Sequence, residues 1–217
     1  MLKVEHITTG YGKKQVLTDV SFEVKKGDAV LLGGGNGSGK STVLKTIYGL
    51  LKPWADAQKG KIIFEEKEIT ALPVSAMIRH GIVYMPQKKN VFEDFSVEEN
   101  LSVSAGIYPK TEARKRKDKV FEILPKLKTM RKRTPFHLSG GEKQLLAFGN
   151  ALIHSPKLAL LDEPFAGVDA DNSEIFCSCI ADLKKENVTF VIVEHKKQLL
   201  KSVTNREIEL ELGRIRR

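Results

Sequence analysis

Short apolar runs along the chain predict strands that are covered on both faces. The residues Ala29–Leu32, Leu158–Leu161 and Val188–Val193 form such runs. Parallel strands with helices on both sides of their sheet have this pattern, because neither face meets water. Two further short strands are predicted at 61–64 and 82–85. These runs indicate a mainly parallel sheet at the centre of the fold.

The N-terminal part of the chain has a different pattern, in which apolar and polar residues alternate. Leu2–Ile7 and Val20–Val24 have the period of half-buried strands. They are separated by a loop that contains Tyr11 and Gly12 and by a short segment, Gln15–Leu17. We therefore expect an antiparallel β subdomain ahead of the parallel sheet.

Helices are predicted between the later strands, and residues 96–130 differ from the rest. They contain long helical stretches and few strand runs, so they look like a helical insertion into an α/β frame. The other expected elements are helices at 40–50, 140–153 and 170–186, a short helix after His195 and a last strand near Ile208. The fold class predicted is α/β, with a mainly parallel sheet, an N-terminal antiparallel subdomain and an inserted helical subdomain.

Composition fits one globular core. Of 217 residues, 41% are hydrophobic and 29% are charged, which excludes a disordered or collagen-like chain. The longest run without Asp, Glu, Lys or Arg spans residues 144–156, whereas a bilayer-spanning helix needs about 20 apolar residues. The N-terminus has no apolar run of the secretory type. We therefore expect a protein without a membrane span that stays in the cytoplasm.

Positive charge is concentrated in one part of the chain. Eleven basic and three acidic residues lie between Lys110 and Arg133, which accounts for most of the formal net charge of +9. Only Phe121 supplies an aromatic ring within this basic segment, so the pattern gives little support to nucleic-acid binding. A solvated helix face and contact with anionic lipid headgroups both remain open.

The two cysteines, Cys177 and Cys179, lie two residues apart in a predicted helix and so point in different directions. This spacing favours neither a disulfide framework nor a zinc site, and buried, unreactive thiols are expected.

The residues from Gly34 to Ser41 fit the pattern G-x-x-x-x-G-K-[ST], between an apolar strand and a helix. In such a phosphate loop (Walker A), backbone N–H groups and the helix N-terminus surround phosphate oxygens. Lys40 can reach the β- and γ-phosphates, and the Ser41 hydroxyl can bind Mg²⁺. A nucleoside triphosphate is therefore the expected ligand. The residues assigned to it here are Gly34, Gly35, Asn36, Gly37, Ser38, Gly39, Lys40, Ser41 and Thr42.

A second part of the site is predicted in LALLDEP, residues 158–164, where an apolar strand ends in two carboxylates. Ligands of α/β sheets bind at the carboxyl ends of strands. Asp162 would hold magnesium, and Glu163 is placed to orient or deprotonate an attacking water.

A third motif, LSGGEKQ at 138–144, begins another helix with a serine and two glycines, which is a second anion-binding geometry. With this motif the whole chain resembles the nucleotide-binding domains of the ATP-binding cassette (ABC) family. There, Ser139, Gly140 and Gly141 would cap ATP that is held by the opposite subunit. The resemblance implies one P-loop domain over residues 1–217, with a helical subdomain at about 88–143.

The same resemblance implies roles for four more residues. Tyr11 looks like the aromatic residue that stacks on adenine, and Gln87 like the glutamine that senses magnesium and water. Asp169 is similar to the acidic residue of the loop that joins two sites, and His195 to the switch histidine near the γ-phosphate. The predicted catalytic set is thus Glu163, His195, Gln87 and Lys40, and the predicted metal set is Ser41, Gln87 and Asp162.

The sequence departs from the family pattern at two positions. Gly35 stands where the family usually has proline, and Glu142 replaces a glutamine at the end of the signature motif. Neither change removes a ligand or a base, so a hydrolysing site is expected, with ATP and Mg²⁺ bound.

The family implies a homodimer or heterodimer of two ATPases on transmembrane permease subunits, at the inner face of the membrane. Residues 87–101 would then line the groove for a cytoplasmic helix of the permease. Val91, Phe92 and Phe95 are expected to be exposed there, with packing into the core as the alternative.

The motifs resemble two subfamilies. GIVYMPQKKNVF and LSGGEKQLLAFGNAL look like the ATPases of branched-chain amino acid importers, whereas FAGVD, with His195, is more similar to the ATPase of lipopolysaccharide export. A soluble ABC ATPase without a membrane partner is a third alternative. The transported substrate and the direction of transport are left open by the sequence.

Overall fold

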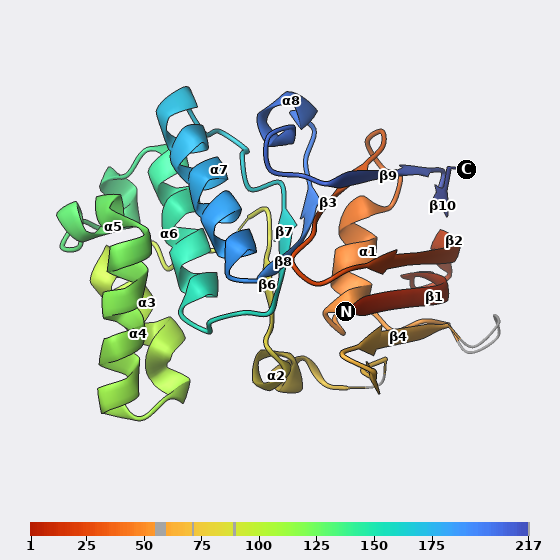
Figure 1. The fold of residues 1–217 in the computed structure, drawn as a ribbon, viewed down its shortest axis with the longest axis horizontal. Coiled ribbons are helices and arrows are strands. Elements are labelled where there is room, and N and C mark those ends of the chain that lie inside the picture. The colour runs from red at the N-terminus through yellow and green to blue at the C-terminus, as the bar shows by residue number, and fades with distance from the viewer. Residues whose placement is uncertain (55–59, 71, 89, 217) are drawn as a thin grey trace.

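The computed structural model describes residues 1–54, 60–70, 72–88 and 90–216, which form two sheets with helices packed around them (Figure 1). A six-stranded sheet has the order β10-β9-β3-β8-β7-β6, and a four-stranded sheet the order β2-β1-β4-β5. The strands are β1 (Leu2–Tyr11), β2 (Lys14–Val24), β3 (Ala29–Gly33), β4 (Lys61–Phe64), β5 (Lys67–Glu68), β6 (Ile82–Met85), β7 (Leu158–Asp162), β8 (Thr189–Val193), β9 (Arg206–Glu211) and β10 (Arg214–Ile215). The α-helices are α1 (Lys40–Ile47), α2 (Val74–Met77), α3 (Val97–Ser104), α4 (Lys110–Ile123), α5 (Pro125–Thr129), α6 (Gly140–Leu152), α7 (Ala170–Lys185) and α8 (Lys197–Leu200). Three 3₁₀ turns lie at Ile78–His80, Ala105–Ile107 and Pro135–His137.

The six-stranded sheet separates two hydrophobic cores. Its strands β3, β7 and β8 are buried at every position, and β3, β6, β7, β8 and β9 pair in parallel. Along β3, Ala29 and Leu31 face the core under the helices, whereas Val30 and Leu32 face the core shared with α1 and the N-terminal sheet. The alternation explains why these strands are apolar throughout: each residue meets one core or the other.

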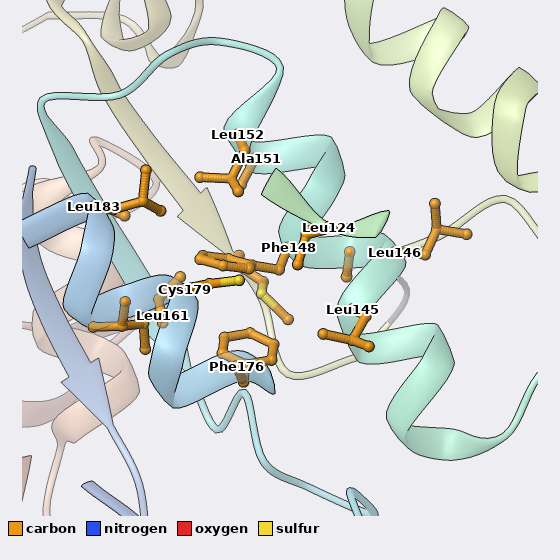
Figure 2. Packing of buried hydrophobic residues seen from close by; sticks show 14 of the residues in the cluster. Leu124, Leu145, Leu146, Phe148, Ala151, Leu152, Leu161, Phe176, Cys179 and Leu183 are labelled. Atoms are coloured by element: carbon orange, nitrogen blue, oxygen red, sulfur yellow. The ribbon is translucent and has the colours of Figure 1, made fainter. Parts of the chain in front are cut away.

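The core on the helical side is built mainly by α6 and α7. Figure 2 shows Phe148 and Phe176 lying against each other between these helices. Their ring centroids are 4.4 Å apart, and Phe165 approaches Phe176 at 5.1 Å. Each fully buried aromatic side chain removes a large apolar area from water, so this cluster fixes both helices against the sheet that carries the site.

The N-terminal sheet is antiparallel as predicted, but its second strand begins earlier. β2 runs without interruption from Lys14, whereas Gln15–Leu17 and Val20–Val24 were expected as separate segments. Register shifts between Val4 and Ile7 and between Ile7 and Thr9 of β1 break the alternation that the prediction relied on. A β-bulge inserts one extra residue into a strand, so the side chains beyond it change faces of the sheet while the strand itself continues.

The helix after the phosphate loop is shorter than expected. α1 ends at Ile47 instead of residue 50, because Gly49 adopts a φ of 78°, which leaves the right-handed helical region. The helical insertion at 96–130 is present as α3, α4 and α5, on the far side of α6 from the sheet (Figure 1). The subdomain boundaries at about 88–143 stay a prediction, and Lys89 lies outside the described residues.

The two cysteines were expected to be buried and to point in different directions. Cys179 is buried, but Cys177 is only half-buried, with its thiol 3.1 Å from the carbonyl oxygen of Leu199. The two thiols point to different neighbours, as expected, because Cys179 lies 3.5 Å from the carbonyl oxygen of Ile123. Among the described residues, no helix is long and apolar enough to span a membrane.

Candidate functional site

The phosphate loop connects β3 to α1 in a conformation that needs its glycines. Gly34, Gly37 and Gly39 all have positive φ values, and a Cβ at Gly39 would lie 2.6 Å from the Leu17 side chain. Lys40 begins α1 and folds back over the loop, where its Nζ donates to the carbonyl oxygens of Gly34 at 2.9 Å and Gly35 at 2.8 Å. Burial lowers the pKa of Lys40, an effect opposed by the nearby carboxylates of Glu163 and Asp162.

A cleft of about 540 Å³ opens above this loop. It is lined by residues from the loop, from the β1–β2 turn and from the ends of β7 and β8. The predicted site residues along its wall are Tyr11, Asn36, Gly37, Gly39, Lys40, Ser41, Thr42, Glu163 and His195. Tyr11 keeps 45% of its surface exposed at the cleft, as a ring that stacks on a base would require.

Asp162 ends β7 and is held at both carboxylate oxygens. Oδ1 accepts a hydrogen bond from the Ser41 hydroxyl at 2.8 Å, and Oδ2 accepts one from the Tyr84 hydroxyl at 3.0 Å. The side chain is 4% exposed, and burial raises its pKa, while the two hydrogen bonds act in the opposite direction. Burial also raises the pKa of Tyr84, with the Asp162 charge as a further cause. The result is a buried carboxylate beside a hydroxyl, both of them hard oxygen donors.

Glu163 follows directly in an unusual backbone conformation. Its φ of 51° turns the chain out of the strand, while its N–H still donates to the Val193 carbonyl at 2.9 Å. Two predicted catalytic side chains contact its carboxylate: Gln87 Nε2 donates to Oε2 at 2.5 Å, and His195 Nε2 lies 3.1 Å from Oε1. Of the four predicted catalytic residues, Lys40, Glu163 and His195 line the cleft. Gln87 is not part of the cleft wall and reaches the site through its contact with Glu163.

The structure reveals one functional candidate that sequence reasoning missed. Glu194 is only 4% exposed, and its carboxylate accepts three backbone N–H groups. Oε1 accepts from His195 at 2.9 Å and Lys196 at 3.1 Å, and Oε2 from Phe165 at 3.1 Å. It thereby ties the segment after β8, which carries His195, to the segment after Glu163. The available signal was a carboxylate directly after a buried strand, next to His195.

The signature segment, residues 138–144, lies outside this cleft in the part of the chain that the structure describes. Ser139 caps α6 with its side chain, which accepts from Glu142 N, while Glu142 Oε2 accepts from Ser139 N at 2.9 Å. Glu142 thus completes a capping box, a role that glutamate and glutamine share. Within one chain, Ser139, Gly140 and Gly141 do not meet the phosphate loop.

The glycines of the signature segment pack against the segment of Asp169. A Cβ at Gly140 would lie 2.8 Å from the Gly167 carbonyl oxygen, and one at Gly141 would lie 2.7 Å from Asn172 Nδ2. Asp169 caps α7 and accepts from Asn172 N at 2.9 Å, a contact that lowers the pKa of Asp169. The signature segment and the loop of Asp169 therefore form one packed unit.

The segment expected to receive a partner is partly exposed. Phe92 is 52% and Phe95 42% exposed, and their ring centroids are 5.7 Å apart. The prediction for Val91 is wrong: it is half-buried and packs against the core on the helical side. The buried Asn100 explains this loop's shape, because it bonds the backbone of Phe92, and through its Nδ2 also that of Phe95.

Comparison with known proteins decides the family. The family model described as ABC transporter matches residues 17–166. The chain belongs to the ABC transporter ATP-binding family. Cassettes of this family bind and hydrolyse ATP, so the predictions of the family, of the fold class and of an ABC-type ATPase are confirmed.

Curated relatives match nearly the whole cassette. The high-affinity branched-chain amino acid transport ATP-binding protein BraG of Pseudomonas aeruginosa is 40% identical, over 99% of this chain and 91% of its own. The probable branched-chain amino acid transport ATP-binding protein LivF of Archaeoglobus fulgidus is 36% identical, over 99% and 90%. The lipopolysaccharide export system ATP-binding protein LptB of Haemophilus influenzae is 31% identical, over 99% and 88%.

Solved structures agree with this assignment. A nucleotide-free cassette from an ABC transporter has a TM-score of 0.89 at 30% identity and covers 99% of this chain and 89% of its own. A cassette in its ADP conformation has a TM-score of 0.88 at 31% identity, over 100% and 89%. A dimeric post-hydrolysis cassette bound to ADP and phosphate has a TM-score of 0.86 at 26% identity, over 100% and 97%.

Proposed function

We propose that this cassette hydrolyses Mg²⁺–ATP with the residues that meet at the end of β7, and that two cassettes together power a membrane transporter. The observation that carries the proposal is the contact of Glu163 with both Gln87 and His195, beside the phosphate loop. A carboxylate in this position can take a proton from water, and Gln87 and His195 can both orient the carboxylate.

ATP would occupy the cleft with its base on Tyr11 and its phosphates in the loop Gly34–Thr42. Lys40 would exchange its contacts with the Gly34 and Gly35 carbonyls for β- and γ-phosphate oxygens. Backbone N–H groups at the start of α1 favour the same negative charge. This part of the site binds and orients ATP, and it does not itself transfer a proton.

The donor set fits magnesium. Ser41 Oγ and Asp162 Oδ1 are 2.8 Å apart, and Mg²⁺ prefers hydroxyl, carboxylate and phosphate oxygens. Ser41, Asp162 and the amide oxygen of Gln87 are the residues that would hold it. When bound, the ion supplies neutralisation of charge that develops on the β- and γ-phosphates.

Hydrolysis then follows from the geometry around Glu163. Glu163 holds a water and accepts its proton as the water oxygen bonds to the γ-phosphorus, while the bond from that phosphorus to the ADP oxygen breaks. Gln87 orients the carboxylate through its amide N–H. His195, on the other carboxylate oxygen, lies at the cleft wall and would contact the γ-phosphate. The products are ADP and inorganic phosphate.

Two copies would complete each site. At the N-terminus of the 13-residue helix α6, Ser139 and Gly140 are exposed and Gly141 is buried directly behind them. None of the three lines the cleft of its own chain. A γ-phosphate held by one copy would match this anion-binding geometry on the other. Asp169, packed beside the signature segment, would lie at the junction of the two sites. A dimeric relative bound to ADP and phosphate supports this arrangement.

The substitution Glu163→Gln tests the mechanism and the dimer together. It removes the proton acceptor but keeps the shape, so the variant should form an ATP-bound dimer with ATP and Mg²⁺ at micromolar concentration, measured by size-exclusion chromatography with light scattering. Glu122→Gln, on the exposed side of α4, is the matched control and should leave ATPase activity intact. A Glu163→Gln protein that remains monomeric, or still turns ATP over, would contradict the assignment.

Import of branched-chain amino acids is the transport function that the relatives support best. The relatives at 40% and 36% identity are named for that transport, and the exposed Phe92 and Phe95 offer an apolar surface to a permease helix. The cassette would then sit peripherally at the inner face of the membrane. Lipopolysaccharide export is the second candidate, supported by LptB at 31% identity.

Uptake measurements separate the two transport functions. Cells whose chromosomal copy carries Glu163→Gln should lose uptake of labelled leucine, isoleucine and valine, while uptake of an unrelated solute stays normal. Normal leucine uptake together with a defect in the outer surface lipid would favour the export function instead.

A further inference from the structure

Tyr84 touches the predicted metal site, although the sequence analysis assigned it no binding or catalytic role. It lies on β6, two residues before Pro86 and three before Gln87, and pairs in register with Leu160 of β7. Its hydroxyl reaches the last residue of that neighbouring strand, where it donates to Asp162 Oδ2 at 3.0 Å. The hydroxyl of this half-buried tyrosine is thus paired with the carboxylate assigned to magnesium.

The contact with Tyr84 uses the carboxylate oxygen of Asp162 that does not face Ser41. Oδ1 faces Ser41, the other predicted ligand, whereas Oδ2 faces Tyr84. The carboxylate is therefore fixed in its plane by a hydrogen bond to the oxygen that does not face Ser41. Outer-shell hydrogen bonds of this kind orient ligating carboxylates, and their loss typically costs 10–100-fold in metal affinity or activity.

The ring of Tyr84 is itself held. It lies against Tyr48 at the end of α1, with 5.5 Å between the ring centroids, and the ring is half-buried. Three residues further on, Gln87 donates to Glu163, the residue next to Asp162. The end of β6 thus makes a side-chain contact with each of the two consecutive carboxylates.

We infer that Tyr84 is a positioning residue for Asp162 and sets the affinity of the site for the metal–ATP complex. The inference rests on the proposed Mg²⁺–ATP site. Two residues at the end of β6 and just after it would then position the two neighbouring carboxylates. Tyr84 positions Asp162, and Gln87 positions Glu163.

The test compares Tyr84→Phe with Tyr48→Phe, both in a Glu163→Gln chain so that ATP is not consumed. Each substitution removes one hydroxyl from the same pair of packed rings and keeps ring and volume. Two dissociation constants are measured, for ATP in EDTA and for Mn²⁺–ATP, the latter from the electron paramagnetic resonance signal of protein-bound Mn²⁺.

Tyr84→Phe should weaken Mn²⁺–ATP binding about tenfold and leave metal-free ATP binding within about twofold. Tyr48→Phe should change neither constant. In the chain with native Glu163, Tyr84→Phe should also raise the Mg²⁺ concentration for half-maximal ATPase activity.

Three results would overturn the inference. Equal Mn²⁺–ATP binding by Tyr84→Phe and its parent would show that the hydroxyl does not position Asp162. A parallel loss of metal-free and metal-dependent binding, or the same loss in Tyr48→Phe, would show a general structural effect. Absence of protein-bound Mn²⁺ in the parent chain would instead contradict the proposed magnesium site itself, and the inference with it.

Discussion

The buried carboxylate of Glu194 offers a sharp test of how the site is held together. Glu194 accepts three backbone N–H groups, from His195, Lys196 and Phe165, and lies almost completely out of contact with solvent. Glu194→Gln keeps the size of the side chain and one acceptor oxygen. If that oxygen keeps the N–H groups of His195 and Lys196, the new amide N–H₂ group points at the Phe165 N–H, donor against donor.

The size of the effect follows from these contacts. A hydrogen bond to a charged group contributes about 1.5–3 kcal/mol, so losing the Phe165 contact should lower the free energy of unfolding by about 2 kcal/mol. For a chain of this length that corresponds to a fall of about 4–8 °C in Tm. Displacement of His195 from Glu163 should lower kcat by about ten- to a hundredfold, while KM for ATP changes less, because Lys40 and the phosphate loop are untouched.

Thermal unfolding and steady-state ATPase assays measure both effects on the same protein. Glu211→Gln is the matched control, because the Glu211 carboxylate is mostly exposed. Its ion pair with Arg216, with 3.9 Å between nitrogen and oxygen, contributes little to stability. Unchanged Tm and kcat in Glu194→Gln would refute the view that this carboxylate holds His195 in place.

Two further predictions concern other parts of the fold. Phe92→Asp should leave the ATPase activity of the isolated cassette within about twofold and abolish transport by the complex, because Phe92 is exposed away from the cleft; loss of activity in the isolated cassette would contradict a pure docking role. The pKa of His154 is lowered by burial and by the Arg116 charge, with Nδ1 3.1 Å from the Tyr108 hydroxyl. The unfolded chain therefore binds the proton more readily, so stability is complete above the unfolded value of 6.5 and is lost as the pH falls through the lower, folded pKa. His154→Gln should remove this component from a series of denaturation curves between pH 7 and pH 5, and an identical pH slope in both proteins would contradict it.

The sequence predicted best those segments in which the residue type directly reflects burial or backbone conformation. Ala29–Leu32 and Leu158–Leu161 are apolar at every position because each meets one of two cores, and this burial is visible in the sequence itself. The phosphate loop was equally predictable, since its glycines serve backbone conformations such as the φ of 104° at Gly39.

Features that depend on distant contacts were not predictable in this way. Register shifts between β1 and β2 allow Gln15–Leu17 and Val20–Val24 to belong to one strand, and Val91 packs against the core on the helical side. Tyr84 and Asp162 are separated by 78 positions, and the burial of Glu194 results from segments that meet only after folding. A single residue has no periodic pattern that could indicate its role in the sequence. Its role can be inferred only once a structure shows which residues it contacts.

The measurement that tests the central claim most directly is to isolate the Glu163→Gln variant with ATP from its own cells, after solubilising the membranes in detergent, and to identify the proteins that accompany it. The variant holds the closed, ATP-bound state in which an ABC cassette should grip its partners. We expect integral membrane permease subunits, together with a second cassette that is identical or different. Purification with ribosomes or DNA-bound complexes, or with no membrane subunit at all, would contradict a transporter ATPase and place this cassette among the soluble ABC proteins.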